Sequence, residues 1–531
     1  LGMARRFSAP SSRAQHHDHA EPVGARRGTQ RSHPPATDTE QAPPAPKVES
    51  RTSSTTLSQL TETKFADQPI HAATKRAITK DMGYATMTVV QAQSLPVALT
   101  GVDVLAKAKT GTGKTLAFLI PAIEAVVREP RAAHRRISAL IISPTRELAT
   151  QIEEEAKVLI AHHDGLRVQC IVGGTKPGKD LAGFKLCPDI LVATPGRLND
   201  HLENSGLADM CRDLRCLVFD EADQLLDMGF RPAITQILRA LPDKRKRQTL
   251  LFSATMPDDV QAIAQLAARE TVQFVDTIGE QDNTHSHVAQ EVVVTSKEEQ
   301  MPELVSVLRA TIAADPTHFK VVVFFTTARQ TQLFAELFTS LGFPVLEIHS
   351  RLSQPRRKKV SDEFRLAKKA ILFTSDVSAR GMDYPDVTRV IQVGAPSDKA
   401  QYVHRLGRTA RAGKEGSGLL LLCDYERFFV KELGDLPVVP KKALSREECG
   451  KIMPEVRRGL ASLDDRTLVS AYQAWMGFYN GMLRKMGWRK EDLVRTANEW
   501  VTGTLGRDAV PALEAKTVGM MGLRGVEGLV V

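Results

Sequence analysis

The sequence predicts an α/β protein with two tandem domains, each built on a mainly parallel sheet, followed by a helical extension. Short apolar runs alternate with helical patterns from about residue 61 to 276, and the same alternation restarts after a polar interval. Beyond residue 435 strand-like runs give way to helical spacing. A chain of 531 residues also exceeds what one compact core supports.

Residues 1–60 are rich in Pro, Ser, Thr, Arg and His, and we expect a disordered tail because such a segment cannot bury enough apolar surface to fold. Arg5, Arg6 and Arg13 precede the first acid, Asp18, a balance typical of a mitochondrial transit peptide. A spacer without any address is the alternative. The first residue is Leu1, so we expect the transit region to be truncated.

The first domain is predicted at 61–276. Its expected strands each end in a polar or glycine turn and are "DVLAKA", "ALIISP", "VQCIVGG", "DILVATP", "CLVFDEAD" and "TLLFSAT". The polar stretch "TIGEQDNTHSHV" at 277–288 is predicted to be a linker.

The second domain is predicted at 289–435, with strands in "QEVVVTS", "KVVVFFTT", "PVLEIHS", "AILFTSD", "RVIQVGAP" and "GSGLLLLCD". Residues 436–531 are predicted to form a helical C-terminal extension, on the spacing in "DRTLVSAYQAWMGFYNGMLRKM" and "KEDLVRTANEW".

Composition restricts the function classes only mildly. The net charge of +9, from 71 basic and 62 acidic residues, is compatible with a polyanionic partner. The six cysteines show no metal-ligand spacing, and we interpret them as reduced, mostly buried thiols. No apolar stretch approaches the ~20 residues that span a bilayer, so we expect no membrane role.

A phosphate-binding loop is predicted between the first strand and the helical "LAFLIPAIEAVV". Glycines let successive backbone N–H groups turn toward phosphate oxygens, and a lysine can reach the terminal phosphates while a threonine hydroxyl ligates Mg²⁺. The usual pattern has glycine where this chain has Ala108. The residues expected to bind the nucleotide here are Thr110, Gly111, Thr112, Gly113, Lys114 and Thr115.

Three acids follow the apolar run "LRCLVF". Because ligands of such sheets lie beyond the carboxyl ends of the strands, Asp220 is predicted to hold Mg²⁺, usually through water, and Glu221 to accept a proton from, or orient, the attacking water. Asp223 has a local alternative, as a cap of the following helix.

Eight ordered motifs carry a family resemblance: "AKTGTGKT", "PTRELA", "GG" at 173–174, "TPGR", "DEAD", "SAT", "TSDVSARGMD" and "HRLGRTARAG". Together they resemble the DEAD-box RNA helicase family over about residues 65–435. The resemblance implies two tandem RecA-like domains, ATP and Mg²⁺ as cofactors, and an RNA-stimulated ATPase. The segment "AYQAWMGFYN" further resembles fungal mitochondrial members that act as RNA chaperones in intron splicing.

The resemblance assigns further nucleotide contacts. Gln91 would pair with adenine N6 and N7, Phe65 would pack on the base, and Asp383 would contact the ribose. The family's proline near this glutamine is Met87 here. Arg408 and Arg411 would act as arginine fingers on the γ-phosphate. The three-residue spacing that joins them to Arg405 predicts one helical face.

RNA contacts are expected to use backbone amides, Thr hydroxyls and Arg, which bind phosphate and 2′-hydroxyl groups without reading bases. The residues assigned are Arg146, Gly174, Thr194 and Arg197 in the first domain and Thr326, Arg351, Arg357, Thr374, Arg380 and Gly381 in the second. Coupling between the domains is assigned to Asp223, Ser253, Thr255 and His404. We interpret the basic runs "KRKR" (244–247) and "RRKK" (356–359) as solvated charges, with a nuclear-localisation reading of the first as an alternative.

The expected function is an ATP-dependent RNA helicase or RNA chaperone that closes two domains on ATP and RNA and separates short duplexes. The expected partners are single-stranded RNA and short duplexes, the expected state is a monomer, and the expected compartment is the mitochondrial matrix. An ATP-gated RNA clamp, a DNA helicase, and a nuclear or cytoplasmic helicase of ribosome biogenesis remain as alternatives. The aromatics Trp475, Phe478, Tyr479 and Trp488 are expected to brace the second domain or simply to pack in a core.

Overall fold

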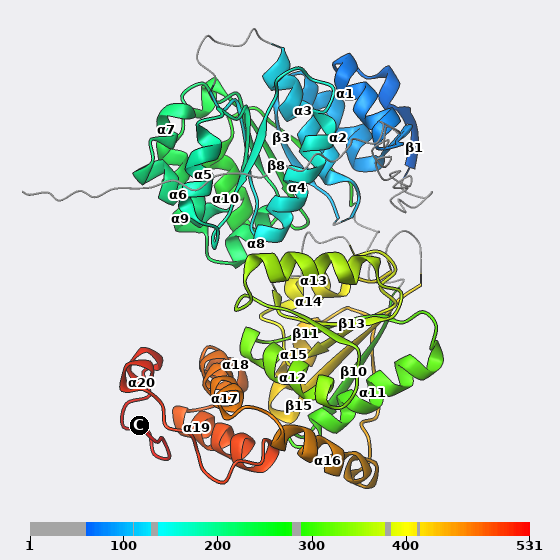
Figure 1. Ribbon diagram of the computed structural model, residues 1–531, viewed down its shortest axis with the longest axis vertical. Coiled ribbons are helices and arrows are strands. Elements are labelled where there is room, and N and C mark those ends of the chain that lie inside the picture. Colours follow the sequence, from blue (N-terminus) through cyan, green and yellow to red (C-terminus); the bar gives the residue numbers. More distant parts are fainter. Residues whose placement is uncertain (1–59, 110, 129–135, 279–287, 377–383, 411–414) are drawn as a thin grey trace, which may run out of the picture. The chain divides into compact units, whose positions relative to one another are not determined.

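The computed structural model describes residues 60–109, 111–128, 136–278, 288–376, 384–410 and 415–531. Two seven-stranded sheets organise this part of the chain, and a helical extension follows the second (Figure 1). We call the first sheet with its helices lobe 1 and the second lobe 2. Among the described residues, no helix is both long and apolar enough to cross a bilayer.

The lobe 1 sheet has the order β5-β6-β4-β7-β8-β3-β9, and every pairing in it is parallel. Its strands are β3 (Asp103–Lys107), β4 (Ala139–Ile142), β5 (Val168–Ile171), β6 (Ile190–Ala193), β7 (Cys216–Phe219), β8 (Gln248–Ser253) and β9 (Val272–Asp276). A small antiparallel pair, β1 (Leu60–Lys64) and β2 (Thr86–Thr88), precedes it.

The helices of lobe 1 cover both faces of this sheet, because successive strand side chains point to opposite sides. Ile141 of β4 packs in a core with α2, α3 and α4, whereas Leu140 and Ile142 pack in a second core with α6, α9 and α10. The helices are α1 (Ala72–Arg76), α2 (Val89–Leu99), α3 (Lys114–Val127), α4 (Arg146–Leu159), α5 (Pro177–Phe184), α6 (Pro195–Asn204), α7 (Leu207–Met210), α8 (Ala222–Asp227), α9 (Arg231–Ala240) and α10 (Asp258–Ala267), with short turns η2 (Phe65–Asp67), η3 (Ala77–Asp81) and η4 (Lys244–Lys246).

Lobe 2 repeats the plan, with the strand order β12-β13-β11-β14-β15-β10-β16 and parallel pairings throughout. Its strands are β10 (Ala289–Thr295), β11 (Lys320–Phe325), β12 (Val345–Ile348), β13 (Ala370–Thr374), β14 (Arg389–Val393), β15 (Ser417–Cys423) and β16 (Val438–Pro440). Its helices are α11 (Gln300–Ala314), α12 (Ala328–Ser340), α13 (Gln354–Leu366), α14 (Lys399–Leu406) and α15 (Phe428–Leu433), with the turn η7 (Asp424–Glu426).

The helical extension comprises α16 (Arg446–Ala461), α17 (Asp465–Asn480), α18 (Leu483–Met486), α19 (Lys490–Glu499), η8 (Trp500–Thr504) and α20 (Ala515–Met521). Helix α16 packs on α11 and α12, and α17 packs on α12 (Figure 1). Trp475 and Tyr479 share one hydrophobic core with Val323 and Phe373 of the lobe 2 sheet. The extension therefore completes the core of lobe 2.

The structure corrects three sequence-based expectations about the elements. Residues 436–531 are not purely helical, because β16 pairs in parallel with β10 and extends the lobe 2 sheet. The strands β1, β2, β9 and β16 were not predicted. All are short or lie at sheet edges, where half-exposed positions blur the apolar pattern.

The third correction concerns the basic runs. Arg247 is only 4% exposed at the start of β8 and Arg357 is only 4% exposed on α13, so neither is a solvated charge. Arg245, Lys246 and Arg356 do lie in exposed positions, as expected, whereas Lys244 is half-buried. Residues within one basic run therefore have different environments, which composition cannot reveal.

Candidate nucleotide and RNA site

The phosphate loop lies between β3 and α3, at the carboxyl edge of the lobe 1 sheet. Gly111 and Gly113 have φ of 78° and 90°, the left-handed region that favours glycine. A Cβ at Gly113 would lie 2.5 Å from Nε2 of Gln91. Backbone conformation and close approach thus both require glycine at position 113. Thr110 lies outside the described residues.

Gln91 is buried and holds this loop. Its Nε2 donates to the Gly113 carbonyl at 3.0 Å, and its Oε1 accepts from the Thr88 amide at 2.9 Å. The Thr88 side chain in turn caps α2 in a reciprocal capping box with Gln91. The pattern Thr-x-x-Gln is a sequence signal that could have identified Thr88 in advance. Phe65 is 1% exposed and belongs to the lobe 1 core.

The acids of the 220–223 cluster follow β7, whose neighbour β8 lies beside β3. Lys114 Nζ lies 2.8 Å from Glu221 Oε1, and the two side chains are 6% and 3% exposed. Glu221 has a φ of 49°, a strained conformation for a residue with a Cβ. Such strain persists where the surroundings fix the backbone, as they do at functional sites.

Charges in this cluster shift one another's protonation. Burial, and then repulsion from Glu221, raise the pKa of Asp220 to about 7, although the attraction of Lys114 opposes them. Burial acts to lower the pKa of Lys114, but Glu221 and Asp220 outweigh it and the pKa is raised. The lysine therefore stays charged and compensates one carboxylate of the cluster.

Asp223 connects the acid cluster to β8. Its Oδ2 accepts from the Thr255 amide at 3.1 Å and from the Thr255 hydroxyl at 2.9 Å, while its own amide donates to Ser253 Oγ at 3.1 Å. Nε2 of His404, from lobe 2, lies 3.6 Å from the same Oδ2. The structure thus brings together the four residues to which we assigned coupling, and that role stays a prediction.

The lobe 1 residues predicted to contact RNA follow β4, β5 and β6, which are neighbours in the sheet. The Arg146 guanidinium packs on Gly174, where an added Cβ would lie 2.4 Å from Nη1. Arg197 Nε lies 3.2 Å from Asp180 Oδ2, and Arg197 Nη2 also donates to the Thr175 hydroxyl at 3.2 Å. Thr194 is buried at the start of α6.

Asp180 was not among the residues predicted for the site. Asp180 is buried, and its Oδ2 also lies 3.0 Å from Nε2 of His201. No local pattern links Asp180 to Arg197, because only folding brings these positions of α5 and α6 together. Its location shows that one buried carboxylate fixes the Arg197 side chain.

The lobe 2 residues predicted to contact RNA follow the neighbouring strands β11, β12 and β13. Thr326 is half-buried and Arg351 is exposed. Thr374 is fully buried, and its hydroxyl donates to the Ile348 carbonyl at 2.8 Å. Arg357 donates to Glu147 Oε2 at 2.6 Å. The last two side chains would have to leave these partners to touch RNA. Arg380 and Gly381 lie outside the described residues.

The predicted helical face of arginines is wrong in part. Helix α14 ends at Leu406, so Arg408 lies beyond the helix and does not continue the face of Arg405. Arg405 pairs with Asp376 at 2.8 Å, and Arg408 is 1% exposed. Glycine at position 407 ends the helix, a signal that three-residue spacing ignores. Arg411 and Asp383 lie outside the described residues.

Comparisons with known proteins fit this arrangement. A model described as "DEAD/DEAH box helicase" matches residues 88–263, and one described as "Helicase conserved C-terminal domain" matches residues 300–413. The chain is 47% identical over 475 residues to DEAD-box ATP-dependent RNA helicase 26 of Oryza sativa subsp. japonica, covering 89% of this chain and 87% of the relative. The chain belongs to the DEAD-box ATP-dependent RNA helicase family.

Other relatives extend beyond the chain. It is 47% identical to DEAD-box ATP-dependent RNA helicase 31 of Arabidopsis thaliana over 89% of its own length but spans only 66% of that protein. Among solved structures, Mss116p with its NTE and C-tail deleted, bound to ssRNA and AMP-PNP, has a TM-score of 0.75 at 29% identity, covering 87% of this chain and 95% of that one. The two parallel-sheet lobes are thus a RecA-like helicase core, as predicted.

Proposed function

We propose that this chain is an RNA-stimulated ATPase and RNA helicase that binds RNA without sequence preference and separates short duplexes. The observation that carries the proposal is the buried ion pair between Lys114 and Glu221, at the strand edge where the phosphate loop and the acid cluster meet. Burying charged groups in this way costs stability, because they lose their hydration. Such clusters are therefore typical of functional sites. Membership of the helicase family supports the same activity.

ATP and Mg²⁺ are the cofactors that this donor set fits. The Thr115 hydroxyl and the Asp220 carboxylate would hold the cation, which prefers oxygen ligands and would neutralise charge on the phosphates. Glu221 Oε2 is buried and has no hydrogen-bond partner among the described residues. That oxygen is available to orient a water molecule and accept its proton. Lys114 would leave its ion pair with Glu221 and bind the terminal phosphates instead.

Substitution of Glu221 by Gln tests the chemistry. We expect the variant to bind an ATP analogue and RNA normally and to lose about 10³-fold in RNA-stimulated ATP hydrolysis, because a general base is removed at constant shape. Glu270→Gln, an exposed substitution in the same lobe, serves as the matched control. Unchanged turnover in Glu221→Gln would assign the base elsewhere.

Strand separation is tested on a short RNA duplex with ATP and, in parallel, with AMP-PNP. The proposal predicts that ATP releases the strand in multiple turnovers. Tight RNA binding with no strand release would instead identify an ATP-gated clamp. Stimulation of the ATPase by single-stranded DNA as strong as by RNA would identify a DNA helicase.

We further propose that the protein acts in mitochondria, in RNA splicing or processing. Support comes from Arg5, Arg6 and Arg13 ahead of the first acid and from the resemblance of "AYQAWMGFYN" to fungal mitochondrial members. The full chain carrying a C-terminal fluorescent tag should locate to mitochondria, and reversal of these three arginines to Glu should abolish that import. A nuclear or nucleolar signal would contradict the proposal and favour ribosome biogenesis.

A further inference from the structure

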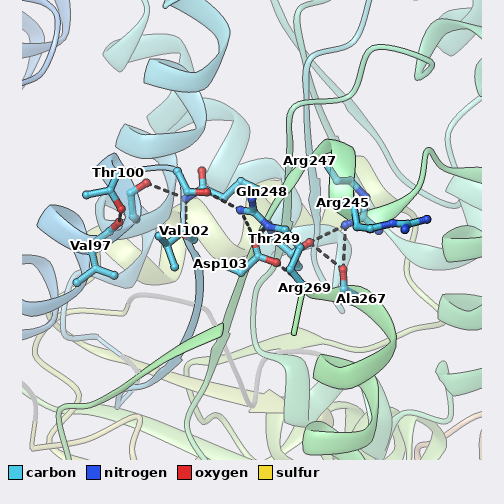
Figure 2. A network of polar contacts seen from close by, with 12 residues as sticks. Val97, Thr100, Val102, Asp103, Arg245, Arg247, Gln248, Thr249, Ala267 and Arg269 are labelled. Carbon is cyan, nitrogen blue, oxygen red and sulfur yellow. Dashed lines mark hydrogen bonds and ion pairs between the residues drawn. The ribbon is translucent and has the colours of Figure 1, made fainter. Parts of the chain in front are cut away.

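A basic cavity of about 290 Å³ lies at the amino edge of the lobe 1 sheet, the edge opposite to the phosphate loop. It is lined by the ends of α2 and α3, by residues that precede β7 and β9, and by the segment that leads from η4 into β8. Figure 2 shows Arg245, Arg247, Gln248 and Arg269 of this lining with their polar contacts. In a parallel sheet these positions share the edge where the strands begin. The cavity is therefore distinct from the nucleotide site.

Positive charge dominates the wall of this cavity. Among the described residues of the wall, Glu124 is the one acid. Its carboxylate accepts from the His71 amide at 3.0 Å and from the Thr74 hydroxyl at 2.9 Å, so it is already hydrogen-bonded within the protein. The basic residues of the wall are Arg128, Arg215, Arg245, Lys246, Arg247 and Arg269.

Two of these basic residues pair with a carboxylate of the described residues. Arg269 Nη2 pairs with Asp103 Oδ1 at 2.6 Å, and Arg245 Nε pairs with Asp243 Oδ1 at 3.0 Å. Arg128 and Lys246 form no salt bridge within this part of the chain. The positive charge of Arg128 and Lys246 is therefore not paired with any carboxylate of the described residues.

Arg247 is the residue that distinguishes this cavity from an ordinary basic surface. Its side chain is 4% exposed, and its Nη1 donates to the Thr249 hydroxyl at 2.6 Å and to the Ala267 carbonyl at 3.0 Å. Its buried Nε has no hydrogen-bond partner in the described residues. Burial lowers its pKa to about 10, so it remains charged at neutral pH. A buried guanidinium with an unused donor and no paired carboxylate is costly to keep.

We propose that this cavity binds a phosphate group of an anionic ligand, with Arg247 at its base and Arg128 and Lys246 at its rim. Guanidinium groups offer fixed parallel donors that match phosphate oxygens, and an ammonium adds a point charge. The volume lies at the lower end for small-molecule sites, which suits one or two phosphate groups. The ligand is either a phosphate of the RNA backbone outside the carboxyl-edge site or a small phosphate ester.

The test uses the full chain with Lys114→Ala, which weakens phosphate binding at the phosphate loop, and titrates inorganic pyrophosphate by calorimetry without Mg²⁺. The pocket variant is Arg128→Glu/Lys246→Glu, which avoids the buried Arg247. The control is Lys185→Glu/Arg239→Glu, which makes the same change in net charge at exposed residues that do not line the cavity. We expect pyrophosphate to bind about tenfold more weakly to the pocket variant and normally to the control.

A second arm separates the two sources of phosphate. Binding of a long single-stranded RNA is measured with and without pyrophosphate for the same variants. Loss of RNA affinity in the pocket variant alone, with competition by pyrophosphate, assigns the cavity to RNA; unchanged RNA affinity assigns it to a small phosphate ester. Equal pyrophosphate binding in the pocket variant and its parent, or an equal loss in the control, would overturn the proposal. The two pocket substitutions in a chain with Lys114 intact should leave ATP hydrolysis with a short RNA unchanged.

Discussion

Several charged side chains of lobe 1 are buried at the phosphate loop and the acid cluster. Lys114 neutralises only part of the acid cluster, since Asp220 and Glu221 are both 3% exposed or less. The pKa of Asp220 is raised because burial and repulsion from Glu221 both favour its neutral form. The site therefore retains a demand for a further cation.

Nucleotide binding should consequently depend on pH through Asp220. Its pKa in the folded protein, about 7, lies above the ordinary value of 3.8, so protonation increases as the pH falls through 7. Since Mg²⁺ requires the ionised form, affinity for Mg²⁺ and a fluorescent ATP analogue should fall about tenfold between pH ~8 and pH ~6. Asp220→Asn should bind weakly at both pH values, and a pH-dependent loss of the same size in that variant would contradict the assignment.

The glycine pair at 173–174 supports a second prediction. Gly174→Ala would place a Cβ 2.4 Å from Nη1 of Arg146, at a backbone φ of 81° that alanine rarely adopts. Displacement of the arginine should weaken RNA binding about tenfold and leave binding of the ATP analogue unchanged. Gly178→Ala is the matched control, because a Cβ there meets nothing within 4 Å. Equal RNA affinity in both variants would show that Arg146 does not contact RNA.

Among the elements of the extension, α17 joins lobe 2 through a buried carboxyl group as well as by packing on α12. Tyr479 donates from its hydroxyl to Glu426 Oε1 at 2.6 Å, and Glu426 also accepts from the Ala395 and Cys423 amides at 2.7 and 2.9 Å. Glu426 is fully buried, and burial raises its pKa despite these three bonds. One carboxyl group thus links β14, β15 and α17.

Tyr479→Phe should loosen this junction. Removing the hydroxyl leaves a buried carboxyl oxygen with one donor fewer, at a cost of about 1–3 kcal/mol in local stability. Hydrogen exchange of the Ala395 and Cys423 amides should accelerate accordingly. Tyr472→Phe on the same helix is the control, since its hydroxyl bonds to Asn498 within the extension. Unchanged exchange in Tyr479→Phe would show that the bond contributes nothing to the junction.

The longer elements were predictable from local pattern. Buried runs such as "ALII" at β4 alternate with amphipathic helices, and the six predicted strands of each domain all appear in its sheet. The short edge strands were not predictable in this way. For example, β16 has only three residues, and its Val439 is exposed. The boundary of α14 was also missed, although a glycine at the helix terminus gave a local signal.

Across the molecule as a whole, the two sheets present the same kind of edge. Within the described residues, the predicted RNA contacts lie at or beyond the carboxyl ends of β4, β5 and β6 in lobe 1 and of β11, β12 and β13 in lobe 2. Arginines, threonines and glycine backbone dominate these positions. Groups of this kind bind phosphate and sugar, so they carry no information about base sequence.

RNA binding by the full chain should therefore respond to salt far more than to sequence. Exchanging one single-stranded RNA for another of equal length should change the affinity by about threefold or less, whereas raising the salt from ~50 to ~200 mM should weaken it by an order of magnitude or more. Filter binding at several salt concentrations measures both effects. A strong preference for one base composition at fixed salt would indicate base contacts that these residues do not provide.

The order of residues along the chain sufficed to predict the paired α/β lobes, the phosphate loop and the acid cluster, because glycines, lysine and carboxylates lie within a few residues of the strands that present them. Folding alone decided which distant groups meet: Asp180 with Arg197, Glu426 with Tyr479, and the basic residues around Arg247. The reason is physical, since burial and Coulomb interaction depend on separation in space, and tertiary packing sets that separation for residues far apart in the chain.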